Sequence, residues 1–228
     1  MNILCIADSL GLPRDGVKIE DTWFYKLCHS FPQHHFIDRF ERGMLTSRLI
    51  ESEDFSNWAN PDIAIIQLGI CDCAPRVIND KRFTWTLVLR VIKRLRIEKT
   101  FWTTLKKIKG RNNAKCVYTP IKQFENNVKQ YICKLHSTNI KKIIIIKIAL
   151  SDSFPKEKSP YFKENVQLYN NIYQSIQDSK IKLIDPLGNN GKDNSNYFLE
   201  DYYHLNAMGM DKVFQTIKEI LEKDNENI

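Results

Sequence analysis

Two short stretches near opposite ends of the sequence carry the residue types of a nucleophilic catalytic centre. Residues 6–11 read Ile-Ala-Asp-Ser-Leu-Gly and place Ser9 on a sharp turn directly after the first apolar run. Residues 201–204 read Asp-Tyr-Tyr-His. A serine hydroxyl is a poor nucleophile at neutral pH unless a histidine accepts its proton and a carboxylate orients that histidine. The sequence therefore predicts acyl transfer with Ser9 as nucleophile, His204 as base and Asp201 as its acidic partner.

Each stretch alone also has an ordinary structural interpretation. A polar pair such as Asp8-Ser9 after a strand is a common turn or helix cap. The segment from Asp201 to His204 would equally suit a loop that leads into the last helix. Their joint occurrence at opposite ends of an alternating α/β chain favours the catalytic interpretation.

The elements that must position these residues follow from the apolar pattern. Apolar runs alternate with amphipathic segments along the chain, which predicts parallel strands covered by helices on both faces. The run from Ile143 to Ile146 suits a strand that is buried on both sides. We expect strands at 2–7, 35–40, 62–68, 141–149 and 181–184, and helices at 21–31, 45–55, 122–138, 162–178 and 207–223. With 228 residues and 43% hydrophobic content, the chain is expected to form one α/β domain over residues 1–228.

The candidate residues all follow predicted strands. Ser9 follows the first strand, Gly43 the second, residues 69–72 the third and residues 201–204 the fifth. In open parallel sheets, ligands bind beyond the carboxyl ends of the strands. We therefore expect these segments to meet at one edge of the sheet.

The two catalytic stretches resemble the SGNH superfamily, also called GDSL esterases and lipases, and the resemblance covers the whole chain. In that family a GDSL-like box supplies the serine, and a D-x-x-H box supplies the acid and the base. The resemblance implies a three-layer α/β/α sandwich with a flavodoxin-like parallel five-stranded sheet, and hydrolysis through an acyl-enzyme. It also implies an oxyanion hole in which the backbone N–H groups of Ser9 and Gly43 are donors.

The third block of the family pattern is altered in this sequence. The family has G-x-N-D, and this chain reads Gly69-Ile-Cys-Asp72, with Cys71 in place of the asparagine. The resemblance implies that this asparagine donates to the oxyanion, and loss of one such donor typically costs about 100- to 1000-fold in turnover. Because a thiol is only a weak donor, the third oxyanion contact is predicted to be weakened.

A narrower resemblance concerns residues 11–14, 20–23 and 67–76. These segments are similar to SGNH-type proteins found among bacterial surface-polysaccharide biosynthesis genes, in which the asparagine of the third block is often replaced. This implies an esterase, or alternatively an O-acyltransferase, that acts on an O-acyl or O-acetyl group of a carbohydrate or glycan precursor. A non-catalytic protein that binds a glycan or a membrane is the remaining alternative. The candidate substrate-binding residues are Asp8, Arg14, Asp72 and Arg76.

The two arginines in this set have two interpretations. Arg14 and Arg76 would orient an acidic sugar or a nucleotide phosphate through paired hydrogen bonds. Alternatively, each is a surface arginine that closes a loop.

Residues 81–115 form the most unusual segment, because the fold requires only a crossover there. Between positions 90 and 111, nine basic residues against the single acid Glu98 give a net charge of +8, whereas the whole chain carries +7. One helical stripe is apolar, and large aromatic residues lie near it; these residues are Leu87, Val88, Val91, Ile92 and Leu95, with Phe83, Trp85, Phe101 and Trp102. The pattern predicts a basic amphipathic helical insertion.

Two roles remain open for this insertion, and a third is not expected. Its apolar stripe would pack on the enzyme as a lid over the site, or residues 83–111 would associate with the anionic cytoplasmic face of a membrane. Nucleic-acid binding is not expected, because aromatic and basic residues lie on opposite faces and no recognised nucleic-acid module accompanies them. No segment reaches the ~18 apolar residues that are needed to cross a bilayer.

The remaining features concern cofactors and environment. The cysteines are scattered and show neither a C-x-x-C pair nor histidines at metal-ligand spacing; they are Cys5, Cys28, Cys71, Cys73, Cys116 and Cys133. We therefore expect no metal, no cofactor and no disulfide framework. The N-terminus lacks a signal-peptide pattern, so we expect a cytoplasmic protein, with peripheral attachment to the inner membrane as an option. A composition rich in lysine, isoleucine and asparagine suggests a bacterial source, and no repeat specifies an oligomeric state.

Overall fold

The computed structural model describes residues 1–51, 55–76, 83–109, 116–157, 159–176, 178–188 and 193–225. Five strands form a sheet in the order β2-β1-β3-β4-β5, and all neighbouring strands are parallel. The strands are β1 (Asn2–Ala7), β2 (His35–Phe40), β3 (Ile63–Gln67), β4 (Lys142–Ile146) and β5 (Ile181–Ile184). This order confirms the predicted flavodoxin-like sheet.

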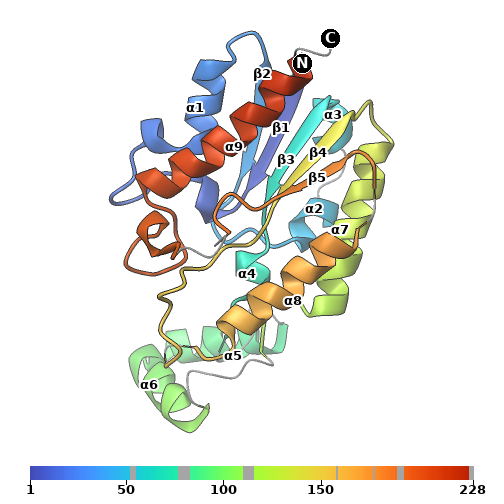
Figure 1. The fold of residues 1–228 in the computed structure, drawn as a ribbon. Coiled ribbons are helices and arrows are strands. Elements are labelled where there is room, and N and C mark those ends of the chain that lie inside the picture. Colours follow the sequence, from blue (N-terminus) through green and yellow to red (C-terminus); the bar gives the residue numbers. More distant parts are fainter. Residues whose placement is uncertain are drawn as a thin grey trace.

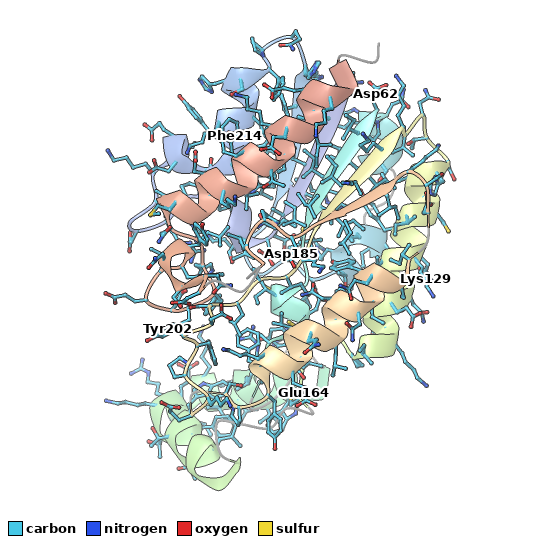
Figure 2. The ribbon with its side chains drawn as sticks, in the orientation of Figure 1. Asp62, Lys129, Glu164, Asp185, Tyr202 and Phe214 are labelled. Carbon is cyan, nitrogen blue, oxygen red and sulfur yellow. The ribbon has the colours of Figure 1, made fainter. Side chains whose placement is uncertain are left out.

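Helices cover both faces of the sheet (Figure 1). One face carries α1 (Trp23–Ser30) and α9 (Ala207–Asn225), and the other carries α7 (Ile121–His136) and α8 (Phe162–Ser175). Side chains fill the space on both sides of the sheet, as Figure 2 shows, with Phe214 of α9 among those that are buried. The predicted three-layer α/β/α architecture is confirmed.

The central strands are apolar throughout because their alternate side chains enter two different cores. Along β4, Ile143 and Ile145 pack with α7 and α8. Ile144 and Ile146 pack with α1 and α9. Burial on both faces fixes the register of the strand, since a shift by one residue would exchange the two sets.

Most predicted elements are present with small differences at their ends. The strand predicted at 141–149 ends at Ile146, and the following residues form a loop. The helix predicted at 45–55 is replaced by two short helices, α2 (Ser47–Glu51) and α3 (Phe55–Ala59), and residues 52–54 lie outside the described part of the chain. Short turns follow β1 and β3 at the carboxyl edge of the sheet, namely η1 (Ser9–Gly11) and α4 (Ile70–Cys73).

The predicted insertion contains two helices, α5 (Phe83–Arg94) and α6 (Glu98–Lys109). They project at the end of the molecule that lies beyond α4 and the start of α8 (Figure 1). Arg96 has a left-handed conformation with φ of 57°, and the N–H of Ile97 bonds the carbonyl of Ile92 at 3.2 Å. This Schellman-type arrangement ends α5 and lets α6 start after a tight turn.

The predicted apolar stripe of the insertion is only partly covered. Ile92 is buried, but Val88, Val91 and Leu95 are 42%, 58% and 60% exposed. The expectation that the stripe packs on the enzyme as a lid is therefore wrong for these three residues. The side chain of Leu87 and residues 81–82 and 110–115 lie outside the described part of the chain. None of the described helices combines the length and the apolar character that a membrane crossing requires.

Candidate active site

Ser9 is held at the carboxyl end of β1 by a turn that the local sequence specifies. The Asp8 carboxylate caps this turn, because its Oδ1 accepts a hydrogen bond from the N–H of Leu10 at 2.9 Å. A Cβ at Gly11 would lie 2.7 Å from the Cβ of Ala7. Only glycine therefore allows the chain to fold back so closely on the strand. The result is a serine that lines a pocket at the sheet edge.

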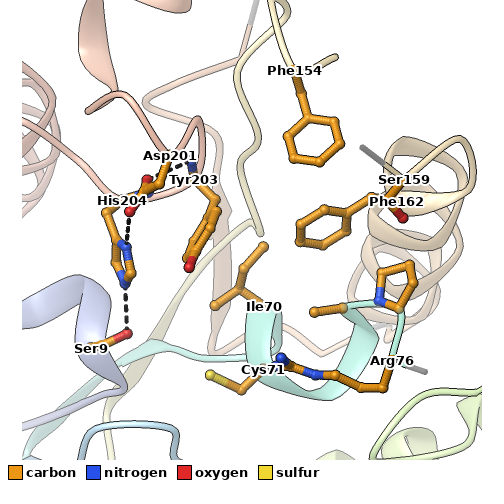
Figure 3. A pocket seen from close by; sticks show the side chains of 12 residues that line it. Ser9, Ile70, Cys71, Arg76, Phe154, Ser159, Phe162, Asp201, Tyr203 and His204 are labelled. Atoms are coloured by element: carbon orange, nitrogen blue, oxygen red, sulfur yellow. Dashed lines mark hydrogen bonds and ion pairs between the residues drawn. The ribbon is translucent and has the colours of Figure 1, made fainter. Parts of the chain in front are cut away.

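Ser9, His204 and Asp201 form a continuous hydrogen-bonded relay (Figure 3). The Oγ atom of Ser9 lies 3.0 Å from Nε2 of His204. Nδ1 of His204 lies 2.5 Å from Oδ2 of Asp201. The same carboxylate also accepts the backbone N–H of His204 at 2.9 Å through Oδ1. This geometry allows a proton to pass from the serine hydroxyl to the histidine while the carboxylate orients the ring.

The loop that carries His204 is held by backbone contacts between its two ends before α9 begins. Phe198 and Leu205 form an isolated antiparallel bridge, and the N–H of Leu199 bonds the carbonyl of His204 at 2.8 Å. Tyr202 has a φ of 72°, which makes the tight turn between Asp201 and His204. The acid and the base are thus fixed relative to each other by backbone contacts as well as by their side chains.

The electrostatic surroundings favour a neutral imidazole beside an ionised carboxylate. Burial lowers the pKa of His204, the Asp201 carboxylate opposes this shift, and the positive charges of Arg14 and Arg42 add to it. Burial alone would raise the pKa of Asp201, but hydrogen bonds from the His204 ring and backbone lower it overall. A neutral histidine is the form that can accept a proton from Ser9.

Arg14 is positioned by contacts with the nucleophile turn. Its Nη2 donates to the backbone carbonyl of Ser9 at 3.0 Å. Arg14 also pairs with Val17 in an isolated bridge, and Arg42 donates to the carbonyl of Pro13 at 2.9 Å. Of the two interpretations of Arg14, these contacts support an arginine that braces a loop.

The candidates Asp8 and Asp72 lie beneath the pocket and are fully buried. Burial raises the pKa of Asp8 to about 7, and its Oδ2 atom has no hydrogen-bond partner within the described part of the chain. The Asp72 carboxylate accepts the hydroxyl of Thr46 at 2.8 Å and its N–H at 3.1 Å. Asp72 therefore ties α4 to the segment after β2, and neither carboxylate lines the pocket.

The pocket beside Ser9 has a volume of about 420 Å³. Its polar lining comes from Ser9, Cys71, Arg76, Ser159, Asp201, Tyr203 and His204, and its apolar lining from Ile70, Ala74, Pro75, Phe154 and Phe162. Sequence reasoning missed the aromatic wall formed by Phe154, Phe162 and Tyr203. Their positions in the sequence could have indicated two of these residues, because Phe154 lies in the loop that follows β4 and Tyr203 lies inside the Asp-x-x-His stretch.

Arg76 brings a positive charge to the pocket without a carboxylate partner. Its guanidinium carbon lies 4.6 Å from the ring centroid of Tyr118. Its buried Nε atom has no hydrogen-bond partner, and the guanidinium forms no ion pair with any acid in the described ranges. Its charge also acts to lower the pKa of Tyr203 and that of Cys71, against the dominant effect of burial.

The two remaining oxyanion candidates differ in position. The Cys71 side chain points toward Ser9 in Figure 3 and lines the pocket. Burial, followed by the nearby Asp8 and Asp72 carboxylates, raises the pKa of this thiol, so it stays protonated. Gly43 lies in the turn after β2 with a φ of 71° and lines a separate hollow. The role of its N–H as an oxyanion donor stays a prediction.

Among the residues that the structure describes, no group of three or more histidine, cysteine, aspartate and glutamate side chains is arranged so that it could hold a metal ion.

Comparisons with known proteins agree with this geometry at the level of the fold. No protein-family model and no curated protein matches the chain. Among solved structures, TesA matches with a TM-score of 0.60 and 13% identity, over 97% of this chain and 98% of that chain. A GDSL-like lipase from Bacteroides thetaiotaomicron matches with a TM-score of 0.59 and 15% identity, over 97% of this chain and 88% of that chain. The chain has the fold of the GDSL-like hydrolases.

An acetyl xylan esterase, AlAXEase, shares this GDSL-like fold with a TM-score of 0.57 and 18% identity, over 95% of this chain and 100% of that chain. The matches span nearly the full length on both sides, so they confirm the predicted fold class. The resemblance to proteins of polysaccharide biosynthesis genes stays a prediction.

Proposed function

We propose that this protein is a serine esterase that works through Ser9, His204 and Asp201. The observation that carries the proposal is the relay of 3.0 Å and 2.5 Å contacts among these side chains at the edge of the pocket. A serine hydroxyl, a neutral histidine and an ionised carboxylate in this order form the minimal machinery for acyl transfer. The GDSL-like fold, which esterases and lipases share, supports the same conclusion.

The reaction has two steps. In the first, Ser9 Oγ attacks the ester carbonyl while His204 takes its proton, and collapse of the tetrahedral intermediate breaks the ester C–O bond. His204 then returns the proton to the departing alkoxide, which leaves as the alcohol. In the second step, water gives a proton to His204 as it attacks the acyl carbonyl, and collapse of the second tetrahedral intermediate breaks the bond between the acyl carbon and Ser9 Oγ. His204 returns the proton to Ser9 Oγ, which restores the serine and releases the acid. Asp201 stabilises the imidazolium that forms in each step.

The oxyanion of each intermediate is expected to meet the backbone N–H groups of Ser9 and Gly43, with Cys71 at the third position. Backbone donors do not depend on the side chain at position 71, so replacement of the asparagine does not remove them. The thiol adds only a weak hydrogen bond.

The substrate that we propose is an ester, with an O-acyl or O-acetyl group on a carbohydrate or glycan precursor. Phe154, Phe162 and Tyr203 offer aromatic faces against which a sugar ring can pack. Arg76 offers a guanidinium for an anionic group on the same molecule, such as a carboxylate or a phosphate. The acetyl xylan esterase among the similar structures supports the carbohydrate assignment. O-acyl transfer is the same chemistry with a second alcohol in place of water.

The proposal is tested with a fluorophosphonate probe and 4-nitrophenyl acetate. We expect the probe to label Ser9 and the ester to be hydrolysed, and we expect both activities to disappear in Ser9→Ala. A serine outside the pocket, Ser137, which donates to the carbonyl of Cys133, provides the matched control Ser137→Ala. Absence of labelling in a folded sample would overturn the proposal and favour a binding protein.

A further inference from the structure

The α5–α6 pair carries a row of apolar side chains that the rest of the described protein leaves exposed. Val88, Val91 and Leu95 recur at three- and four-residue spacing and are 42%, 58% and 60% exposed, and Ile97 follows at 47%. Ile92 is the inward-facing member, with 7% exposure. Contiguous exposed apolar patches usually mark an interaction site on a protein surface. We call the four exposed residues, together with the basic residues that border them, the docking surface.

Basic side chains border this apolar row. At about 100° per residue, Arg90 and Arg94 lie on the side of α5 opposite the buried Ile92, with Arg94 next to Val91, and Lys93 lies on the flank between Arg90 and Ile92. Arg96 and Lys99 continue the basic border through the turn into α6. All five are exposed, and no acid in the described ranges forms an ion pair with them.

The charge of the segment restricts what can cover it. Residues 83–109 contain eight basic residues and one acid, Glu98. A second copy of the chain would bring two such segments together, and juxtaposed like charges are unfavourable. An exposed apolar row beside unpaired basic residues instead matches a helix that lies in the plane of a lipid interface. Each basic residue near an anionic leaflet strengthens such binding about fivefold.

The docking surface lies at the same end of the molecule as the pocket. In Figure 1, α5 and α6 project beyond α4 and the start of α8. Ile70 and Cys71 of α4 and Phe162 of α8 line the Ser9 pocket. We propose that the docking surface binds peripherally to a phospholipid bilayer that carries anionic headgroups, and thereby holds the pocket near the membrane. This binding does not depend on the chemistry of Ser9.

Vesicle flotation with the full chain tests the proposal. The vesicles contain either phosphatidylcholine alone or phosphatidylcholine with about one third phosphatidylglycerol. We expect binding to the anionic vesicles only, and we expect it to weaken when salt is raised from about 0.1 M to about 1 M, because the Debye length falls from about 10 Å to about 3 Å.

Two variants separate the two parts of the docking surface. The triple change Arg90→Gln, Lys93→Gln and Arg94→Gln is expected to weaken binding about 100-fold, since three basic residues are removed. Val91→Ser with Leu95→Ser is expected to weaken it at least tenfold by removing the apolar contact. These side chains are exposed, so folding and hydrolysis of a soluble ester should be unchanged.

Matched controls carry equivalent changes elsewhere on the surface. Lys122→Gln, Lys182→Gln and Lys212→Gln remove the same charge from exposed sites outside α5 and α6. Met208→Ser removes an apolar side chain that is 60% exposed on α9. The proposal would be overturned if the triple control lost as much binding as the triple change in α5. It would also be overturned if the protein bound neutral vesicles as well as anionic ones. The proposal would also be overturned if the unmodified protein were a dimer that does not bind vesicles and the double change Val91→Ser with Leu95→Ser made it a monomer. That result would assign the surface to contact with a second copy of the chain.

Discussion

The protein contains two histidine–aspartate pairs with the same contact distance and different surroundings. His204 Nδ1 lies 2.5 Å from Asp201, and His136 Nε2 lies 2.5 Å from Asp178. The free ring nitrogen of His204 faces the Ser9 hydroxyl at 3.0 Å in a pocket. His136 lies at the end of α7 and does not line the Ser9 pocket or any of the other pockets described. A histidine–aspartate contact alone therefore defines no catalytic site, and it is the serine and the pocket beside His204 that make this pair a candidate catalytic site.

The largest expected effect comes from removing each histidine in turn. His204→Ala should lower kcat/KM for 4-nitrophenyl acetate at least 1000-fold, because Ser9 loses its base. His136→Ala should leave kcat/KM unchanged and affect only stability, since a partly exposed side-chain contact of this kind contributes about 0–1 kcal/mol. Steady-state kinetics on both variants, with circular dichroism to verify folding, checks the contrast. A comparable loss of activity in the two variants would contradict it.

The next effect concerns Arg76, whose guanidinium lines the pocket beside Ser9. We expect Arg76→Gln to lower kcat/KM about 10- to 100-fold for 4-acetoxybenzoate, because a hydrogen bond to a charged group is worth about 1.5–3 kcal/mol. Arg76→Gln should change kcat/KM little for the neutral methyl ester of 4-acetoxybenzoate. Arg48→Gln is the control, since Arg48 pairs with Glu41 and Glu51 on the surface.

The decisive quantity for Arg76 is the ratio of kcat/KM for 4-acetoxybenzoate to kcat/KM for its neutral methyl ester. A ratio that Arg76→Gln leaves unchanged would show that the guanidinium does not meet an anion on the leaving group. Arg76→Lys should retain part of the preference for the charged ester, because lysine keeps the charge and loses the paired geometry.

A smaller effect is expected at position 71. Cys71→Asn would place an amide donor where the side chain points toward Ser9, and we expect kcat to rise about tenfold. Cys71→Ala should change kcat less than threefold, because the buried thiol is protonated and only a weak donor. Rates of release of nitrophenol from both variants check this. A large loss in Cys71→Ala would show that the thiol has a role that the weak-donor account does not include.

The sequence predicted the fold and the members of the relay, and it was less informative about the rest of the site. The central strands could be located because parallel strands that are buried on both faces are apolar, as at Ile143 to Ile146. Ser9, Asp201 and His204 could be located because they lie in short, contiguous stretches next to strand ends. The aromatic wall depends on how the long loop from β4 to α8 folds over the edge. The place of Phe154 after β4 puts it near this edge, but the local sequence does not predict the path of the loop.

The insertion also shows that the sequence did not predict tertiary contacts. Helical periodicity located the apolar stripe of α5, but it did not indicate which part the protein covers. Ile92 and Val91 are adjacent in sequence and both apolar, yet their exposed fractions are 7% and 58%. Periodicity gives the direction of a side chain relative to its own helix, whereas coverage depends on tertiary neighbours.

The smallest expected effect is the pH dependence that follows from the surroundings of His204. Only the neutral imidazole can accept the Ser9 proton, so kcat/KM falls as the pH falls through the pKa of His204. Burial, together with Arg14 and Arg42, lowers this pKa from its usual value of 6.5. Activity should therefore fall less than about threefold between pH 7 and pH 6, which is the decrease that an unshifted histidine would give.

A variant at Arg42 sharpens this test. Arg42 donates to the carbonyl of Pro13 and does not line the pocket. Arg42→Gln removes one of the positive charges that lower the pKa of His204, so the acidic limb of the kcat/KM profile should move to higher pH. Lys129→Gln, on the far helix α7, should leave the profile in place. A limb that moves to lower pH in Arg42→Gln would contradict the assignment of His204 as the titrating base, because removing a nearby positive charge can only favour its protonated form.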